Sequence, residues 1–129
     1  AVTLKLYGEQ FADRTGIRVL VEAKRPVPRL QQDAEMALFR INQEALTNVL
    51  KHAKAGLVRL TLAVDAESVS LTIADDGCGF DAASRHDHRT NGLGLLIMQE
   101  RLRAVKGSLR VDSRPGAGTS VIAKVGRTP

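Results

Sequence analysis

Residues 58–80 read VRLTLAVDAESVSLTIADDGCGF, and this stretch predicts a β-hairpin followed by a loop. Apolar residues occupy every second position over 58–64 and again over 69–73, with polar or small residues between them. This period of two is typical of strands that bury one face, and residues 65–68 supply the turn between them. Strands joined by so short a turn pair antiparallel.

Helical and extended patterns alternate on both sides of this hairpin. A long helix is expected to begin at Asp33 or Ala34 and to end at Ala53, before the exit Lys54-Ala55-Gly56. The other predicted helices cover 1–15 and 93–106, and the other predicted strands cover 17–22 and begin near 109 and 121. The sum predicts an α+β fold, a two-layer α/β sandwich whose helices cover one face of a mixed sheet.

Composition limits the class of protein. The chain has 129 residues, 43% hydrophobic and 26% charged, which predicts one folded domain rather than a disordered tail or a coiled coil. A single cysteine excludes an internal disulfide framework and a multi-cysteine zinc site. The sequence holds no apolar stretch of about 20 residues and no signal peptide. Since it begins at Ala1 without a Met, we expect a domain excised from a longer protein.

The net charge of +5 raises the question of a nucleic-acid partner. Lys and Arg are scattered along the chain, and only 3% of the residues are aromatic and able to stack on bases. This pattern favours a solvated basic surface over nucleic-acid binding. Part of the positive excess could serve a phosphate ligand.

The predicted helix 34–53 has a chemically mixed polar face. At about 100° per residue, Glu44, Asn48, Lys51 and His52 fall on one side, with Ile41 as an apolar exception among them. The apolar residues on the opposite side are Phe39, Leu46, Leu50 and Ala53. An amide oxygen is a ligand that Mg²⁺ accepts, and a lysine can neutralise phosphate. Taken alone, the same face also fits the solvated side of an amphipathic helix.

Three glycine-containing motifs could bring a ligand close to the backbone. The first, 75–80, follows a predicted strand, and the second, 91–95, opens a predicted helix whose first amides can bind an anion. The third, 116–119, lies between two strands. Each has a simpler reading, respectively an Asp-Gly turn, a capped loop end and a hairpin turn. The loop over 75–92 is long for a compact domain, and such loops are often functional lids.

Together the motifs form an ordered set: a polar-faced helix, a strand followed by D-x-G-x-G, a variable loop, G-x-G at a helix start, and G-x-G-T. This set resembles the ATP-binding domain of sensor histidine kinases, in the GHKL superfamily with the Bergerat fold, shared with gyrase, the heat-shock chaperone ATPase and the mismatch-repair ATPase. The resemblance covers about residues 34–125. EALTNVLKHA (44–53) and GLGLLIMQER (92–101) look especially like the nitrate-sensor and desaturase-sensor branch.

The resemblance implies roles for the residues of the helix and the loops. Asn48 would ligate Mg²⁺, Glu44 would sit beside the metal or its water, and Lys51 would contact phosphate; Glu44 and Lys51 are the implied catalytic residues. His52 would line the ribose or phosphate side, and Asp75 would bind the adenine amino group. The other implied nucleotide-binding residues are Gly77, Gly79, Gly92, Leu93, Gly94 and Thr119. Residues 81–92 would form the ATP lid.

The implied activity is that of a two-component sensor kinase, with ATP and Mg²⁺ as cofactors. The chain would donate the γ-phosphoryl group to a histidine on a separate dimerisation domain of its parent protein, which would then pass it to a response regulator. We expect a cytoplasmic domain that meets the membrane only through its parent. A P-loop is absent. Three alternatives remain: a related ATPase with Glu44 as general base, an anti-sigma-type serine kinase, and a nucleotide sensor without transfer activity.

Overall fold

A computed structural model gives the backbone over residues 2–23, 28–53, 55–77, 92–114 and 116–126. The side chains of residues 2–5, 52, 53 and 92–95 lie outside the described set. The elements in chain order are α1 (Val2–Thr15), β1 (Arg18–Ala23), α2 (Gln32–Asn48), the π-helical turn η1 (Val49–Ala53), β2 (Leu57–Val64), β3 (Ser68–Asp75), α3 (Gly92–Ala104), β4 (Ser108–Ser113) and β5 (Thr119–Gly126).

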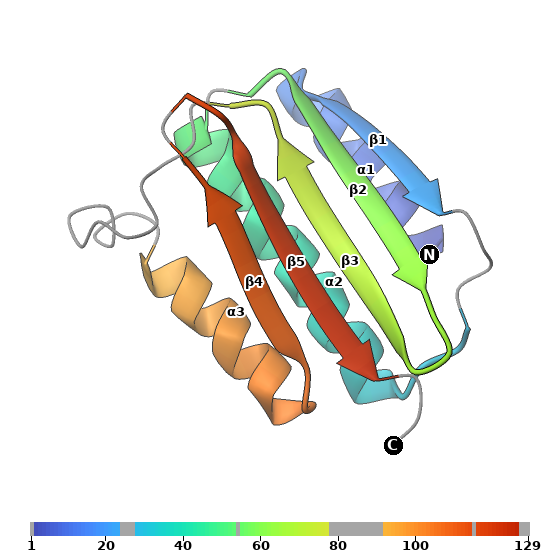
Figure 1. Cartoon of the computed structure of the whole chain (residues 1–129). Coiled ribbons are helices and arrows are strands. Elements are labelled where there is room, and N and C mark those ends of the chain that lie inside the picture. Colours follow the sequence, from blue (N-terminus) through green and yellow to red (C-terminus); the bar gives the residue numbers. More distant parts are fainter. Residues whose placement is uncertain (1, 24–27, 54, 78–91, 115, 127–129) are drawn as a thin grey trace.

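The five strands form one mixed sheet with the order β1-β2-β3-β5-β4 (Figure 1). Strands β1 and β2 pair in parallel, which requires a crossover, and α2 lies on that connection. The other three pairings are antiparallel. The predicted hairpin is confirmed as β2 and β3, and its turn is held by Asp65, whose Oδ1 accepts the amides of Glu67 and Ser68 at 2.8 and 2.7 Å.

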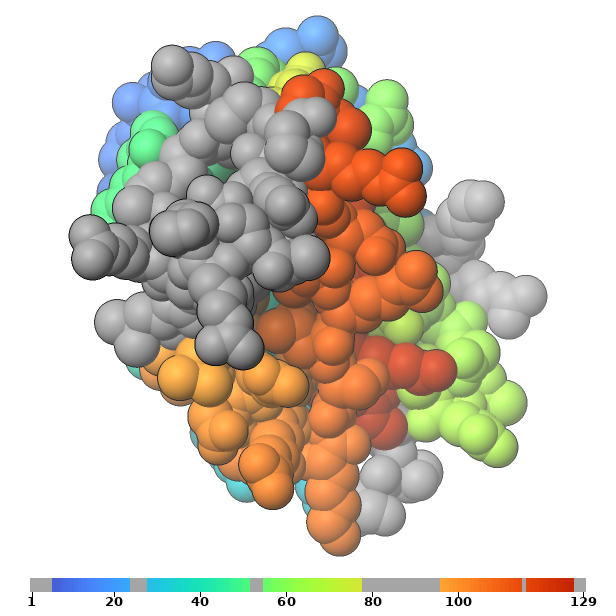
Figure 2. Space-filling model, turned by 60° about the vertical axis from the view of Figure 1, so that its left-hand side comes forward, coloured from blue at the N-terminus to red at the C-terminus, as the bar shows by residue number. Residues whose placement is uncertain are grey.

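All three helices cover the same face of the sheet, so the predicted two-layer architecture is confirmed (Figure 1). The core lies between the layers, where alternate strand residues meet the helices. The largest buried apolar side chains there are Ile41, Leu46, Leu60, Leu71, Ile73, Met98 and Leu102. Strand β4 forms one edge of the sheet, and Figure 2 shows it crossing that face of the molecule beside α3.

The predicted helix 34–53 is confirmed in its position, but it consists of an α-helix followed by a π-helical turn. It runs as an α-helix to Asn48 and then widens into η1. Two expectations about its faces are wrong: Ile41, placed in the polar stripe, is 0% exposed, and Leu50, placed on the apolar side, is 53% exposed. Figure 1 shows the reason, since α2 lies between α1 and α3 as well as on the sheet. Its neighbours therefore bury a broad arc of α2, which the helical period alone does not define.

One polar side chain of α2 is enclosed in this core. Asn42 is fully buried, and neither its Oδ1 nor its Nδ2 has a hydrogen-bond partner among the residues that the structure describes. Leaving such a group unpaired in an apolar interior costs about 1–3 kcal/mol. The α2 layer thus contains a local source of instability.

Candidate functional site

The candidate site lies where β3 ends and β5 begins. Asp75, the last residue of β3, pairs with Thr119, the first of β5, and Thr119 in turn pairs with Ser113, the last of β4. These three residues continue the alternation of the buried row Ile73 and Val121, so their side chains share the helix-covered face. The strand register therefore places a polar row directly beyond the apolar core.

The turn between β4 and β5 is fitted closely to this row. The Ala117 amide donates to the Arg114 carbonyl at 3.0 Å, and Gly118 is buried at a φ of +77°. A Cβ atom on Gly118 would collide with the backbone carbonyl of Asp75. Two features therefore require glycine at position 118: its left-handed backbone conformation and the close approach of the neighbouring strand. The predicted motif 116–119 is thus a hairpin turn that also shapes the site.

The electrostatic environment of Asp75 is unusual for a surface aspartate. Burial raises the pKa of its carboxyl group above the ordinary value of 3.8. Hydrogen bonds from the amides of Gly77 and Thr119 oppose this shift, and the charge of Asp76 adds to it. The Gly77 amide donates to Asp75 Oδ1 at 2.8 Å. The carboxylate is thereby held in one orientation while keeping acceptor capacity for a ligand.

The adjacent Asp76 performs a structural task that the sequence did not reveal. Its Oδ1 accepts the amides of Gly56 and Leu57 at 2.9 and 3.0 Å, and its own amide donates to the Leu57 carbonyl at 3.2 Å. The amides lower the pKa of Asp76. Asp76 thus ties the end of β3 to the segment between η1 and β2.

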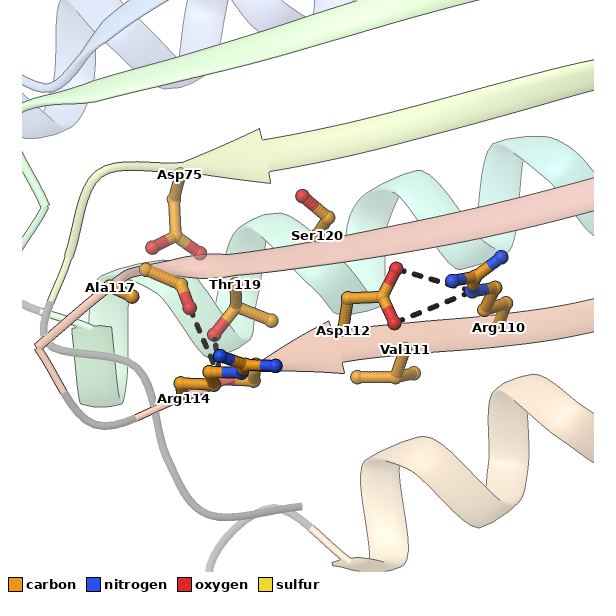
Figure 3. Close-up of a pocket in the computed structure, with 10 residues that line it drawn as sticks. Asp75, Arg110, Val111, Asp112, Arg114, Ala117, Thr119 and Ser120 are labelled. Carbon is orange, nitrogen blue, oxygen red and sulfur yellow. Dashed lines mark hydrogen bonds and ion pairs between the residues drawn. The ribbon is translucent and has the colours of Figure 1, made fainter.

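A cleft of about 480 Å³ opens at this end of β4 and β5. Ligand pockets for nucleotide-sized molecules have volumes of this order. Asp75, Gly118 and Thr119 line it, together with β4 residues that include Ser113 (Figure 3). Figure 3 shows the Asp75 carboxylate close to the start of β5, with the side chains of Thr119 and Ser120 on opposite sides of the β5 ribbon. The cleft therefore combines acceptor groups with a closely approaching backbone.

The predicted metal and phosphate residues lie at the C-terminal end of α2, which Figure 1 places behind the same end of the sheet. Glu44 and Asn48 are partly buried one turn apart, and Lys51 is exposed in η1. Turns of π-helix are frequent at functional sites. The backbone of His52 belongs to η1, but its side chain lies outside the described residues. Among the side chains that the structure describes, no hydrogen bond or ion pair joins Glu44, Asn48 or Lys51 to Asp75.

Oxygen donors of this kind suit Mg²⁺. Within the part of the chain that the structure describes, no group of three or more His, Cys, Asp or Glu could hold a metal ion. Mg²⁺, however, often takes only one or two protein oxygens and completes its shell with phosphates and water. The Asn48 amide oxygen and the Glu44 carboxylate at positions i+4 and i fit that requirement.

Other predicted site residues are described only in part. Gly92 and Gly94 lie in the first turn of α3, as expected, while the side chain of Leu93 is not described. Gly79 and residues 81–91 of the predicted lid fall outside the described residues. The sequence missed Ser113 and Asp76. A serine or aspartate at a strand end was the available signal, but its partners depend on pairing between distant strands.

Comparison with known proteins assigns the chain to a family. Residues 33–129 match the family model described as "Histidine kinase-, DNA gyrase B-, and HSP90-like ATPase". The chain belongs to this family. Membership of these ATPases implies ATP binding. It also confirms the resemblance to sensor histidine kinases and the predicted Bergerat architecture.

Relatives of this ATPase domain include named histidine kinases. It is 36% identical over 123 residues to the "Signal transduction histidine-protein kinase/phosphatase DegS" of Brevibacillus brevis, covering 95% of this chain and 31% of that protein. It is 38% identical over 113 residues to the "Sensor histidine kinase MctS" of Rhizobium johnstonii, covering 88% and 24%. The chain thus spans less than a third of these relatives.

Solved structures of histidine kinases share the fold of this ATPase domain. The histidine kinase domain of the blue-light activated kinase of Erythrobacter litoralis superposes with a TM-score of 0.76 at 26% identity, over 96% of this chain and 59% of that one. Full-length ShkA in complex with AMPPNP gives a TM-score of 0.77 at 27% identity, over 98% and 29%. No helix among the described residues is long and apolar enough to span a membrane.

Proposed function

We propose that this ATPase domain binds Mg-ATP and donates the γ-phosphoryl group to a histidine on a separate dimerisation domain of its parent protein. The observation that carries the proposal is the cleft at which Asp75, Gly118 and Thr119 meet, within the segment matched by the family. The names of the relatives and the AMPPNP complex of ShkA support it.

The adenine is proposed to bind at the strand end. The Asp75 carboxylate would accept a hydrogen bond from the adenine amino group, and Gly77 and Thr119 hold that carboxylate from either side through their amides. Gly79 would continue the wall of this pocket. The half-buried position of Asp75 strengthens such a bond, because water competes less there than at an exposed site.

The triphosphate is proposed to extend towards α2 and α3. Asn48 would hold Mg²⁺ with Glu44 beside it, and Lys51 and His52 would face phosphate and ribose. Bound Mg²⁺ would supply neutralisation of phosphate charge. The backbone at Gly92, Leu93 and Gly94 opens α3, and helix N-terminal amides favour an anion. Residues 81–92 are proposed as the lid over the nucleotide.

In this proposal the protein contributes mainly position and charge. Phosphoryl transfer requires an attacking atom in line with the leaving oxygen and stabilisation of charge on the transferred group. Lys51, exposed in η1, is suited to the second task, and the acceptor histidine would come from the partner domain. We propose that the chain forms one catalytic domain of a cytoplasmic signalling unit, that its parent provides any contact with the membrane, and that a response regulator receives the phosphoryl group.

The deciding experiment combines the chain with the dimerisation domain of its parent and γ-labelled ATP in Mg²⁺. We expect acid-labile label on the dimerisation domain, as phosphohistidine gives. Acid-stable label would support the serine kinase, and released phosphate without labelled protein would support the ATPase with Glu44 as base. Asn48→Ala is expected to abolish Mg²⁺-dependent ATP binding, whereas Gln43→Ala on the same helix serves as control. Unchanged affinity in Asn48→Ala would refute the metal assignment.

A further inference from the structure

We propose that Asp76 positions Lys51 for its contact with the nucleotide phosphates, by anchoring the chain segment that follows η1. This inference rests on the proposed function, because Lys51 has that contact only if the chain binds ATP. Asp76 touches neither nucleotide nor metal in this arrangement and is therefore a positioning residue. Its neighbour Asp75 serves the base, so the two adjacent carboxylates act at opposite ends of the nucleotide.

The carboxylate of Asp76 holds the backbone at the start of β2. Its Oδ1 accepts the amides of Gly56 and Leu57 at 2.9 and 3.0 Å, and the Asp76 amide donates to the Leu57 carbonyl at 3.2 Å. From another side, the Arg18 amide donates to the Gly56 carbonyl at 3.0 Å. Each of these bonds has a backbone amide as its donor, so its direction is certain. Residues 56 and 57 are therefore fixed by the end of β3 and by the start of β1.

The anchored segment lies close to Lys51 along the chain. Since η1 ends at Ala53, at most about 11 Å of extended chain separates its last Cα atom from that of Gly56. Ala55, within this short connection, packs against the core. At the other end of η1, Val49 is buried in the same core. η1 is thus held at both ends, and Lys51 is exposed between them.

The π-helical form of η1 makes this anchor important. A π-helix closes its hydrogen bonds over five residues rather than four, and it is rare outside single turns. Because the two helices differ in their residues per turn, relaxation of η1 towards an α-helix would rotate Lys51 about the helix axis. The bonds to Asp76 restrain the end of η1 against this rotation. Loss of the Asp76 carboxylate should therefore displace the Lys51 side chain, whereas Asn48 remains in α2.

The base pocket should be less affected than the phosphate site. The Asp75 carboxylate lines the cleft and is held by the Gly77 amide at 2.8 Å, a bond that does not involve the Asp76 side chain. Asp76 is exposed, so its truncation leaves no cavity in the core. Figure 1 shows the C-terminal end of α2 at the end of the sheet where β2 begins and β3 ends. The effect of Asp76 should therefore appear in the affinity for ligands that carry phosphate.

The test compares adenosine, followed by NMR titration, with ADP in Mg²⁺, followed by calorimetry, on the 129-residue chain. Asp76→Ala should raise the dissociation constant of ADP about twofold to fivefold, as the loss of one exposed ion pair does, and leave that of adenosine unchanged. Asp76→Asn keeps an oxygen that accepts both amides and should retain the wild-type affinity for ADP. In a Lys51→Ala background, Asp76→Ala should change neither constant. Glu67→Ala, which removes an exposed acid before β3, controls for net charge and should leave both constants unchanged.

The outcomes separate the two proposals. If the wild-type chain does not bind ADP, the proposed function fails, and this inference fails with it. If it binds ADP while Asp76→Ala keeps the wild-type affinity, weakens both ligands equally or still acts in the Lys51→Ala background, the inference alone is overturned. The same holds if Asp76→Asn binds ADP as weakly as Asp76→Ala. Should Asp76→Ala not fold, Asp76→Ser replaces it, since one hydroxyl does not reproduce the reach of a carboxylate, and the same selective loss is expected.

Discussion

Gly118 packs against the backbone carbonyl of Asp75 so closely that no other residue fits there. The contact joins the turn before β5 to the end of β3, and it forms one wall of the cleft. The candidate adenine contact and the hairpin turn are therefore one packing unit. A substitution that moves the backbone of either residue should therefore displace the other.

The first prediction uses this contact. Gly118→Ala should destabilise the fold by about 3–5 kcal/mol, because the Cβ would combine a left-handed backbone with a clash against Asp75. Gly116→Ala is a matched control: its φ is +79°, but a Cβ there meets nothing within 4 Å. It should cost only about 1–2 kcal/mol. Urea unfolding measures both, and equal losses would show that the clash is relieved.

The second prediction concerns the charge of Asp75. Its pKa is raised in the folded chain, so the folded state binds the proton more tightly than the unfolded state does. Asp75 therefore contributes stability below pH 3.8, and this contribution is lost as the pH rises through its folded pKa. Asp75→Asn should remove this loss, so that at pH 7 the variant is at least as stable as the wild type.

The same variant should nevertheless bind ADP more weakly, because the amide can turn a donor towards the adenine amino group. Urea unfolding between pH 3 and pH 7, with Asp112→Asn as surface control, gives the stability. Calorimetry gives the affinity. If Asp75→Asn is less stable than the wild type at pH 7, the buried Asp75 charge does not destabilise the folded chain.

The third prediction concerns Asp76, whose pKa is lowered by the amides of Leu57 and Gly56. A lowered pKa gives stability that is present above the ordinary value of 3.8 and is lost as the pH falls through the folded pKa. Asp76→Ala should therefore lower the melting temperature at pH 7, and its difference from the wild type should shrink in acid. Asp112→Ala, which removes only a surface ion pair with Arg110, should change little. A pH-independent difference would argue against the assigned role.

The fourth prediction concerns Asn42 in the core. Replacing it with leucine, which is apolar and of similar shape, should stabilise the chain by about 1–3 kcal/mol, because the unpaired amide no longer has to be desolvated. Gln99→Leu, an exposed change on α3, is the control and should have little effect. Thermal unfolding decides between them. A destabilised Asn42→Leu variant would mean that the amide has a compensating partner.

The sequence predicted the elements far better than their mutual placement. The hairpin β2–β3 was evident because a period of two is a local property, and the helix over 34–53 was found in the same way. The resemblance already placed Thr119 near Asp75, but the pairing of Thr119 with Ser113 was out of reach, since it depends on strand register. The buried face of α2 was wrongly assigned at Ile41 and Leu50. The helical period gives the angular position of each residue, but it does not tell where α1 and α3 pack against the helix.

Site residues divide along the same line. The motif identified Asp75, Thr119 and Asn48 as candidates, and the fold brings the first two together. It could not identify Ser113 or Asp76, because a serine or an aspartate at a strand end is common in any protein. Their significance lies in the Gly118 carbonyl and in the amides of Gly56 and Leu57, and only the folded backbone brings those groups near.

The polar row at the strand ends has an evolutionary consequence. Because successive strand residues alternate between faces, inserting a single residue within β5 would turn Thr119 outwards and expose the apolar side chains behind it. Under the proposed function, contact with the nucleotide base and formation of the core both depend on the same strand register. Changes in ligand preference among related domains should therefore arise by substitution at the strand ends. Insertions and deletions should be found in the loops rather than within β5.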